Sequence, residues 1–482
     1  MKLVYFLLFL WMPVLQISAQ QTFAKFYGGK GYDEGIAAFP NQDGGYTLIG
    51  NSSTYTTSTS DIWVIKTDSA GNFLSHKTFG SWQFEKGVFA IQHHNGNYYV
   101  VGTTYQNQTQ GYDIYLLGFK EDGTEICQKY FGGSDWDLGV SLDFDSDSTL
   151  IILGQTQSYN LDSRKSVLIR TNLMGDSLFS TIIPSVKIDF ANEIKYCKAC
   201  YFLTGYSMNP PSQQKYAFVQ KVDFDGDSLF RVDLQRNTDC EFKSLCIDPD
   251  SDVVCVGYFT DSVLGFREGL MQKFDFFGNE IFVRELIQND DNVDYRIINS
   301  QSGGYILAGT SKKWSNGEED FHITAFNKDG WWQAGHTHGS SKSDFPNQIF
   351  QDTIRKNVLI AGTSHNTILP QTSFLFVKTD TIFLIASQQY IIINGIEPKS
   401  IDEKLKIYPN PAKDWIVIEQ ANTLNMNLEM ELFDNFGQKI LTITSDSEKI
   451  SKINLQNFSS GIYLLQIKGP DFLQTHRIII TN

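Results

Sequence analysis

Residues 44–50 form the short apolar segment GGYTLIG, and a segment of the same kind, ending on glycine, occurs six more times in the 482-residue chain. The seven terminal glycines are Gly50, Gly102, Gly154, Gly205, Gly257, Gly309 and Gly362. Their successive spacings are 52, 52, 51, 52, 52 and 53 residues. A turn glycine keeps the same period at Gly71, Gly123, Gly175, Gly226, Gly278 and Gly330. Two markers with one period identify an internal repeat, which determines the fold.

Each unit contains four short predicted strands. In the first unit they cover residues 35–39, 46–49, 61–66 and 73–79, with glycine turns between them. A single four-stranded sheet cannot bury both of its faces, whereas several sheets around one axis can. The sequence therefore predicts an all-β protein, a seven-bladed β-propeller over residues 20–392 followed by a small C-terminal β-sandwich.

The two ends of the predicted propeller are expected to pair. Residues 23–29 (FAKFYGG) resemble the ends of fourth strands at 76–80 (HKTFG) and 128–133 (QKYFGG). The seventh unit, from about residue 340, has no turn glycine at the corresponding place. We therefore predict that the N-terminal segment forms the outer strand of the last blade, which would cover an open sheet edge.

The first residues predict a signal peptide over residues 1–19. Lys2 precedes an apolar stretch at residues 3–15, and Ala19 provides a small residue for cleavage. The stretch is shorter than the roughly 20 residues that span a bilayer, and we expect no integral membrane segment in the mature chain. The net charge of −15 and the pI near 5.0, without a Lys/Arg cluster, argue against a nucleic-acid partner.

Two parts of the sequence resemble known families. The repeat phrases at 43–50 (DGGYTLIG) and 61–72 (DIWVIKTDSAGN) resemble propeller repeats of exported Bacteroidetes proteins and delta-60-type repeats. Four blocks of the tail, LKIYPNP (405–411), ELFDNFGQK (431–439), SGIYLLQI (460–467) and RIII (477–480), are similar to the type A sorting domain of type IX secretion cargo.

The second resemblance implies a role for the tail. It identifies residues 405–482 as a sorting domain, residues 393–404 as a linker in which cleavage would occur, and the type IX secretion machinery as a partner. The implied location is secreted or on the outer cell surface, reached through the periplasm. The sorting-motif residues that it implies are Tyr408, Pro409, Asn410, Pro411, Gly437, Gly461, Tyr463 and Arg477.

An acidic residue precedes the first strand of every unit. These residues are Asp33, Glu85, Asp137, Asp189, Glu241, Asp294 and Asp344, with spacings of 52, 52, 52, 52, 53 and 50. One interpretation is a ring of carboxylates that binds cations or basic groups at a mouth of the central channel. The other is a structural role, in which each carboxylate accepts N–H groups from the adjoining blade. Recurrence in all units favours the structural interpretation.

The sequence indicates no metal site. Alternating aspartates at 143/145/147, 223/225/227 and 248/250/252 lack the glycine and glutamate of an EF-hand and fit hairpin turns better. His336 and His338 share one side of a strand, and His93 and His94 lie in a distant turn, without three or four ligands that evidently converge. We expect no cofactor, with calcium as the remaining possibility.

Six cysteines lie in the mature chain of an export pathway that permits disulfides. Cys246 and Cys255 stand equally far from the turn at residues 250–251, so we predict that they form a cross-strand disulfide. Cys197 and Cys200 fall in a turn, where we expect either a disulfide that closes the turn or two free thiols. The pattern assigns no role to Cys127 or Cys240.

No catalytic residue can be nominated, because the sequence has no GxSxG elbow, HExxH motif or phosphate-binding glycine loop. Two function classes remain. The favoured one is a non-catalytic binding or structural module that holds an extracellular glycan or protein, with Trp82 and Trp136 as binding candidates. The alternative is a glycan-acting hydrolase that uses two carboxylates of the ring at the channel mouth.

Overall fold

The computed structural model describes two stretches of the chain. The first is residues 22–392, except 57–58, 82, 107–110, 159–162, 186, 210, 288–290, 313–314, 316–317, 353–354, 366–370 and 381; the second is residues 405–481, except 421–427, 434–438, 446–449 and 469–472. The predicted signal peptide and linker lie outside these residues. The chain divides into two compact units, Met1–Ile393 and Asn394–Asn482. No helix in the described stretches is long and apolar enough to cross a membrane.

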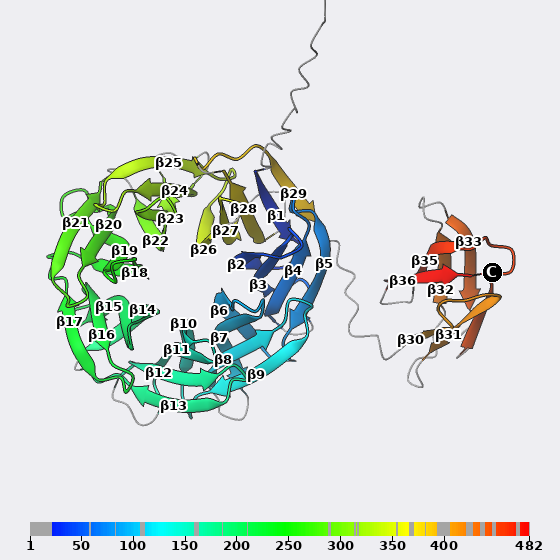
Figure 1. The fold of residues 1–482 in the computed structure, drawn as a ribbon, viewed down its shortest axis with the longest axis horizontal. Helices are drawn as coiled ribbons and strands as arrows, with labels where there is room; N and C mark the ends of the chain where they lie inside the picture. The colour runs from blue at the N-terminus through cyan, green and yellow to red at the C-terminus, as the bar shows by residue number, and fades with distance from the viewer. Residues whose placement is uncertain are drawn as a thin grey trace, which may run out of the picture. The chain divides into compact units, whose positions relative to one another are not determined.

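The described residues of the first unit form seven sheets, which surround a common axis (Figure 1). Sheet 1 contains β2 (Asp33–Pro40), β3 (Tyr46–Ser52), β4 (Asp61–Thr67) and β5 (Phe73–Phe79). Sheet 2 contains β6 (Glu85–Gln92), β7 (Tyr98–Gln106), β8 (Gly111–Phe119) and β9 (Glu125–Phe131). Sheet 3 contains β10 (Asp137–Ser146), β11 (Thr149–Thr156), β12 (Lys165–Asn172) and β13 (Ser177–Ile182).

Sheets 4 to 6 repeat this order of strands. Sheet 4 contains β14 (Ile188–Cys197), β15 (Cys200–Met208), β16 (Lys215–Val222) and β17 (Ser228–Asp233). Sheet 5 contains β18 (Cys240–Ile247), β19 (Val253–Thr260), β20 (Arg267–Phe274) and β21 (Glu280–Leu286). Sheet 6 contains β22 (Asn292–Asn299), β23 (Tyr305–Ser311), β24 (Asp320–Phe326) and β25 (Trp332–His338). The strands of each sheet are ordered as in the sequence, which confirms the all-β propeller class.

Sheet 7 joins the two ends of the unit. Its order is β26 (Asp344–Asp352), β27 (Asn357–Ser364), β28 (Ser373–Thr379), β1 (Phe23–Gly28) and β29 (Gln388–Ile392). The predicted pairing of the N-terminal segment is confirmed, because β1 lies antiparallel to β28. The prediction that it is outermost was wrong, since β29 pairs in parallel with the free edge of β1. The chain after β28 thus returns to cover that edge.

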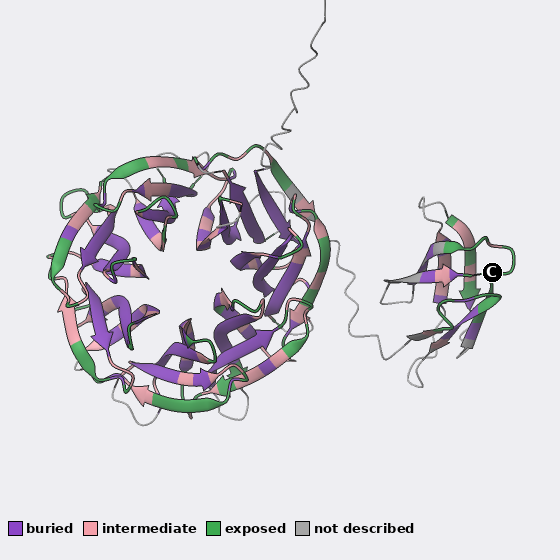
Figure 2. Ribbon diagram, viewed as in Figure 1, coloured by how far each residue is buried: buried purple, intermediate pink, exposed green. Residues whose placement is uncertain are grey.

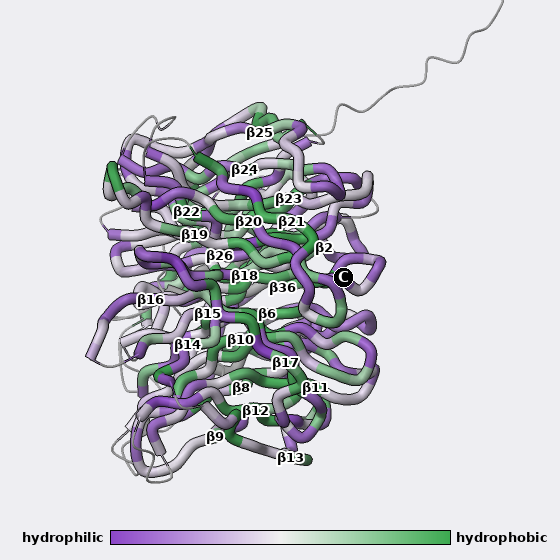
Figure 3. Tube along the Cα trace, turned by 90° about the vertical axis from the view of Figure 1, so that its left-hand side faces the viewer, coloured by the Kyte–Doolittle hydropathy of each residue, from purple (hydrophilic) through white to green (hydrophobic). Residues whose placement is uncertain are grey.

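The core lies between neighbouring sheets. Tyr46 and Trp63 of sheet 1 share one buried cluster with Phe374 and Phe376 of sheet 7. The ring centroids of Tyr46 and Phe376 are 5.2 Å apart. Figure 2 shows the inner strands almost wholly buried, whereas the outermost strands carry the exposed residues. In Figure 3 the hydrophobic stretches follow the strands, and the loops are mostly hydrophilic. Each sheet therefore needs its neighbours on both sides.

The glycine that ends the repeated apolar segment has a packing reason. A Cβ on Gly50 would lie 2.1 Å from the carbonyl oxygen of Glu34, and one on Gly102 would lie 2.0 Å from that of Lys86. The innermost strand opposite contains an irregularity in register at this point, between Gly35 and Ala37 in sheet 1. The bulge brings its backbone too close for any side chain.

The second unit contains two sheets with one hydrophobic core. One sheet has the order β30 (Leu405–Tyr408), β31 (Trp415–Gln420) and β34 (Ile450–Asn454). The other has the order β33 (Lys439–Ser445), β32 (Leu428–Phe433), β35 (Gly461–Lys468) and β36 (Leu473–Ile480). Ile416 of the first sheet and Met430, Leu465 and Ile478 of the second belong to one buried cluster. This is the predicted small sandwich.

Candidate functional site

Five of the seven ring carboxylates occupy the same place in their sheets. Each lies in the innermost strand opposite a serine or threonine of the second strand. The pairs are Asp33 with Ser52, Glu85 with Thr104, Asp137 with Thr156, Asp189 with Ser207 and Asp344 with Ser364. All five side chains are buried, with at most 4% of the residue surface exposed.

Four of these carboxylates bind the loop that enters their own sheet. Asp33 accepts the N–H of Gly29 at 2.8 Å, and Asp137 accepts that of Gly133 at 2.8 Å. The same contact, four residues back, joins Glu85 to Ser81 N and Asp344 to Ser340 N. Because each loop follows the fourth strand of the preceding sheet, the carboxylate anchors the connection between neighbouring sheets. This geometry supports the structural interpretation.

Asp33 shows how fully one of these groups is bonded. It also accepts hydrogen bonds from the hydroxyls of Ser52 at 2.5 Å and Thr54 at 2.8 Å. Burial raises the pKa of Asp33, and the bonds from Ser52, Gly29 and Thr54 oppose that rise.

The predicted equivalence of all seven positions was wrong for sheets 5 and 6. Cys240, opposite Phe259, takes the equivalent place in sheet 5, and Asn292, opposite Ser311, takes it in sheet 6. Glu241 is one residue further along, so its side chain points to the other face of the sheet. Asp294 is two residues further along, on the same face. The spacings of 53 and 50 on the two sides of Asp294 mark its displacement, whereas the spacing of 52 before Glu241 does not reveal the shift in sheet 5.

The two displaced carboxylates bind cationic or imidazole groups. Glu241 forms ion pairs with Lys215 at 2.9 Å and Lys243 at 2.6 Å, and these lysines hold its pKa below the ordinary value although burial opposes them. Asp294 lies 2.9 Å from Nε2 of His322.

Asp189 of sheet 4 has a different kind of partner. Arg231, from the outermost strand, donates to both carboxylate oxygens, at 2.9 Å and 3.0 Å. The guanidinium also lies 4.1 Å from the ring centroid of Phe218. Two parallel bonds from one guanidinium fix both the position and the orientation of this carboxylate.

Aspartates of two acidic turns form ion pairs or hydrogen bonds within the protein. Lys273 forms ion pairs with Asp248 at 2.7 Å and Asp252 at 3.0 Å. Oδ1 of Asp248 accepts the N–H groups of Asp250 and Asp252, as in a hairpin turn. In the triplet at residues 223–227, Oδ1 of Asp223 accepts two main-chain N–H groups in the same way.

The predicted disulfide between Cys246 and Cys255 is not formed, and all six cysteines are free and buried. Cys246 pairs with Val254, whereas Cys255 pairs with Leu245. A shift of one residue in an antiparallel pair places the two side chains on opposite faces of the sheet. The two thiols accordingly belong to different core clusters. Cys197 and Cys200 pair across a tight turn as free thiols.

An aromatic groove, defined by Phe84, Tyr112 and Trp136, lies between sheets 2 and 3. Its volume is about 290 Å³, and Lys86, Val88, Thr103 and Leu138 complete its lining. The ring centroids of Tyr112 and Trp136 are 5.2 Å apart, and those of Phe84 and Tyr112 are 6.1 Å apart. Trp136 is 48% exposed. The other candidate, Trp82, lies outside the described residues.

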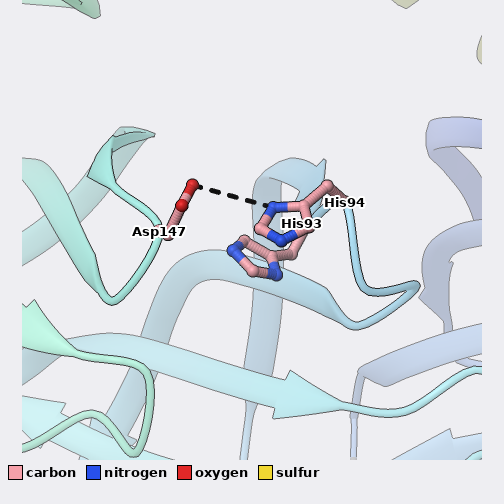
Figure 4. A group of neighbouring side chains, drawn as sticks. All are labelled: His93, His94 and Asp147. Atoms are coloured by element: carbon pink, nitrogen blue, oxygen red, sulfur yellow. Dashed lines mark ion pairs between the residues drawn. The ribbon is translucent and has the colours of Figure 1, made fainter.

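The structure also brings together three residues that the sequence did not link. His93 and His94, in the turn after β6, meet Asp147, in the turn after β10 (Figure 4). The two turns are one repeat apart, and this spacing was the available signal. His336 and His338 remain a pair on β25, and Nε2 of His338 lies 2.7 Å from the carbonyl oxygen of Phe383.

Three of the sorting-motif residues form hydrogen bonds within the second unit. Oδ1 of Asn410 accepts the N–H of Ile479 at 2.9 Å, and Tyr408 donates to Glu419 at 3.1 Å. The hydroxyl of Tyr463 donates to the carbonyl oxygen of Ser459. Pro409 and Pro411 flank Asn410 in the loop after β30, Gly461 begins β35 and Arg477 lies in β36. Gly437 lies outside the described residues.

Comparison with known proteins identifies the tail. Residues 406–481 match the family model described as the secretion system C-terminal sorting domain. The prediction of a type IX sorting domain is thereby confirmed, and it implies export to the cell surface or out of the cell. No curated protein matches the sequence significantly.

Solved structures resemble the chain in fold only. The acylaminoacyl peptidase from Pyrococcus horikoshii is 8% identical with a TM-score of 0.42; the match covers 82% of this chain and only 58% of that protein. The β-propeller domain of the Trilobed protease from Pyrococcus furiosus is 8% identical, with 73% and 95% coverage and a TM-score of 0.43. The polysaccharide lyase Uly1 is 6% identical, with 73% and 90% coverage and a TM-score of 0.45.

Proposed function

We propose that the protein is an exported, non-catalytic binding module, whose aromatic groove holds an extracellular glycan and whose tail engages the type IX secretion machinery. In this proposal the signal peptide at residues 1–19 takes the chain to the periplasm. The tail then directs the folded propeller across the outer membrane. Cleavage within residues 393–404 would release the propeller or leave it attached to the cell surface.

The observation that carries the binding proposal is the half-exposed Trp136. Large aromatic side chains are normally buried, whereas this one lies at an open groove in contact with Tyr112. Exposed aromatic rings suit the apolar faces of sugar rings, and the hydroxyl of Tyr112 and the amine of Lys86 can bond to sugar hydroxyls. Lys86 is held by an ion pair with Glu34 at 2.9 Å.

The alternative hydrolase receives less support from the ring carboxylates. It requires two of them to face a substrate at the channel mouth. Asp33, Glu85, Asp137 and Asp344 are instead buried and receive main-chain N–H groups. A carboxylate that already accepts such bonds is poorly placed to exchange protons with a sugar.

The binding proposal can be tested on the full-length mature protein with an array of oligosaccharides from bacterial and plant polysaccharides. We expect at least one class to bind and Trp136→Ala to weaken that binding about tenfold, the loss of roughly 1.4 kcal/mol of ring contact. Trp332→Ala is the matched control, because Trp332 is a 62% exposed tryptophan on the outermost strand of sheet 6. Equal effects of the two variants, or release of reducing sugar by the protein, would contradict the proposal.

The export proposal is tested by deleting residues 405–482 in a host with a type IX system. The described residues of the propeller form hydrophobic clusters of their own, so the truncated chain should fold and resist protease. We expect it to accumulate in the periplasm, while the full-length chain reaches the surface or the medium. Equal export of both forms would contradict the proposed role of the tail.

A further inference from the structure

The turns after β6 and β10 bring two imidazoles and a carboxylate together at the edge of sheets 2 and 3. One ligand atom from each of His93, His94 and Asp147 lies within 4.8 Å of the others. Nδ1 of His94 is 3.9 Å from Oδ1 of Asp147. Figure 4 shows the histidine side chains from one turn and the aspartate from the other turned toward a shared space. This edge is at the opposite end of β6 from the aromatic groove.

His93 is the anchored member of the group. It is 5% exposed, and its ring lies 4.8 Å from that of Phe144 in the next sheet. The turn holds its backbone through the bonds from His93 N to Asn97 O and from Gly96 N to His93 O. Its Nε2 is buried and has no hydrogen-bond partner among the residues that the structure describes. A buried polar atom without a partner is costly, unless a ligand completes it.

The other two members can move. The side chain of His94 is 68% exposed and that of Asp147 is 95% exposed. Zn²⁺ binds imidazole nitrogen and carboxylate oxygen at about 2.0–2.2 Å, so ligand atoms around it lie roughly 3.3 Å apart. The 3.9 Å between His94 and Asp147 exceeds this by about 0.6 Å, and no pair within the 4.8 Å limit exceeds it by more than about 1.5 Å. Rotation of the two exposed side chains can close such gaps.

We propose that His93, His94 and Asp147 bind one divalent transition-metal ion of the Zn²⁺ class, which links sheets 2 and 3. Two imidazoles and one carboxylate are ligands typical of such ions, and three protein ligands leave a fourth position for water or a ligand group. Ligation through Nε2 places the ring proton of His93 on Nδ1. The weak 3.4 Å contact from Asn95 N to Nδ1 is then lost. The net charge of −15 also favours cation binding.

The test is calorimetric titration of the EDTA-treated full-length mature protein with Zn²⁺. We expect one site per chain, with His94→Ala and Asp147→Asn each lowering the affinity at least tenfold. Both residues are exposed, so the variants should keep the melting temperature of the metal-free protein. Matched controls are His336→Ala, an exposed histidine on β25, and Asp250→Asn, an exposed aspartate in the corresponding turn of sheet 5.

A second readout separates a built site from surface adsorption. Zn²⁺ at 100 times its dissociation constant should favour the folded state about a hundredfold, seen as a rise in melting temperature that each site variant clearly reduces at the same Zn²⁺ concentration. Absence of stoichiometric binding overturns the proposal. So does binding that survives both site variants, or that falls equally with the two control variants.

Discussion

Sheets 1 and 5 differ at one equivalent position of the innermost strand. In sheet 1, Asp33 accepts three hydrogen bonds, including one from the loop that enters the sheet. In sheet 5, Cys240 lies opposite Phe259 in an apolar cluster, and its sulfur is 3.3 Å from the N–H of Ala217. The side chain at this position is buried in every sheet, whereas its polarity follows the local partners.

Sheet 4 extends the comparison, because its carboxylate is neutralised by a cation. Asp189 receives two bonds from Arg231. The same position therefore holds three different groups in these sheets. In sheet 1 it is a carboxylate bonded to an amide and hydroxyls, in sheet 4 a carboxylate bonded to a guanidinium, and in sheet 5 a thiol in an apolar cluster. We expect the loss in the free energy of unfolding to differ among the three sheets when the group at this position, or its partner, is removed.

Arg231→Met should have the largest effect, because it leaves Asp189 buried without its cation. We expect a loss of about 3–5 kcal/mol in the free energy of unfolding, measured by urea denaturation at pH 7. The double variant Arg231→Met/Asp189→Asn should recover part of that loss. A double variant as unstable as the single one would show that the charge is not the cause.

Asp33→Ala should have the next largest effect. It removes the acceptor for Gly29 N and for the hydroxyls of Ser52 and Thr54, so we expect a loss of about 2–3 kcal/mol. Cys240→Ala, the matched change in sheet 5, should cost only about 1 kcal/mol. Equal losses in the two variants would remove the distinction between the sheets.

Asp113→Asn tests the electrostatics between sheets 2 and 3 and should have a small, pH-dependent effect. Burial, with the nearby Asp137 charge, raises the pKa of Asp113 to about 6 from its ordinary 3.8. A raised carboxyl pKa means that the folded state retains a proton that the unfolded state releases. Its contribution to stability is therefore full below about pH 4 and is lost as the pH rises through 6.

The variant should accordingly match the wild type at pH 4 and be more stable at pH 7.5. We expect a gain below about 1 kcal/mol, or roughly 2 °C in melting temperature, because solvent screens part of the interaction. Thermal unfolding at the two pH values measures it. A gain of the same size at pH 4 would point to packing rather than to charge.

The cysteines give the smallest expected effect. All six are buried and free, and burial raises the pKa of Cys200 to about 11 and of Cys255 to about 12. Neutral, buried thiols react slowly, so native protein should react with few equivalents of a thiol reagent and denatured protein with six. If fewer than six thiols react after denaturation without reductant, the protein contains a disulfide and the free-thiol assignment is wrong.

Most of the fold could be predicted from the sequence because each repeat contains two independent signals. Its apolar segments mark the buried strands, and its glycines mark positions such as Gly50, where the opposite backbone leaves no room for a Cβ. The pairing of residues 23–28 with the last sheet was also predictable, since their sequence resembles other fourth strands. The extra strand β29 was not, because residues 388–392 carry no repeat signal.

The candidate sites were less predictable, because they depend on register and on contacts between units. Counting from residues 250–251 made Cys246 and Cys255 partners, but the turn is centred on Asp250, so Ile247 pairs with Val253 and Cys246 pairs with Val254. Spacing alone likewise equated Asp33 with Glu241, although Glu241 faces the other side of its sheet.

By itself the sequence determined the all-β repeat, the order of its strands and the sorting tail, because these follow from periodic patterns and local motifs within single units. Only the tertiary structure decided which side chains of different units meet. Asp147 approaches His93 and His94 because two turns one repeat apart lie side by side in neighbouring sheets. Trp136 reaches Tyr112 in the same way. The physical reason is that a strand pattern specifies which face of a sheet is buried, whereas the packing of one sheet against the next specifies what that face, or its edge, will touch.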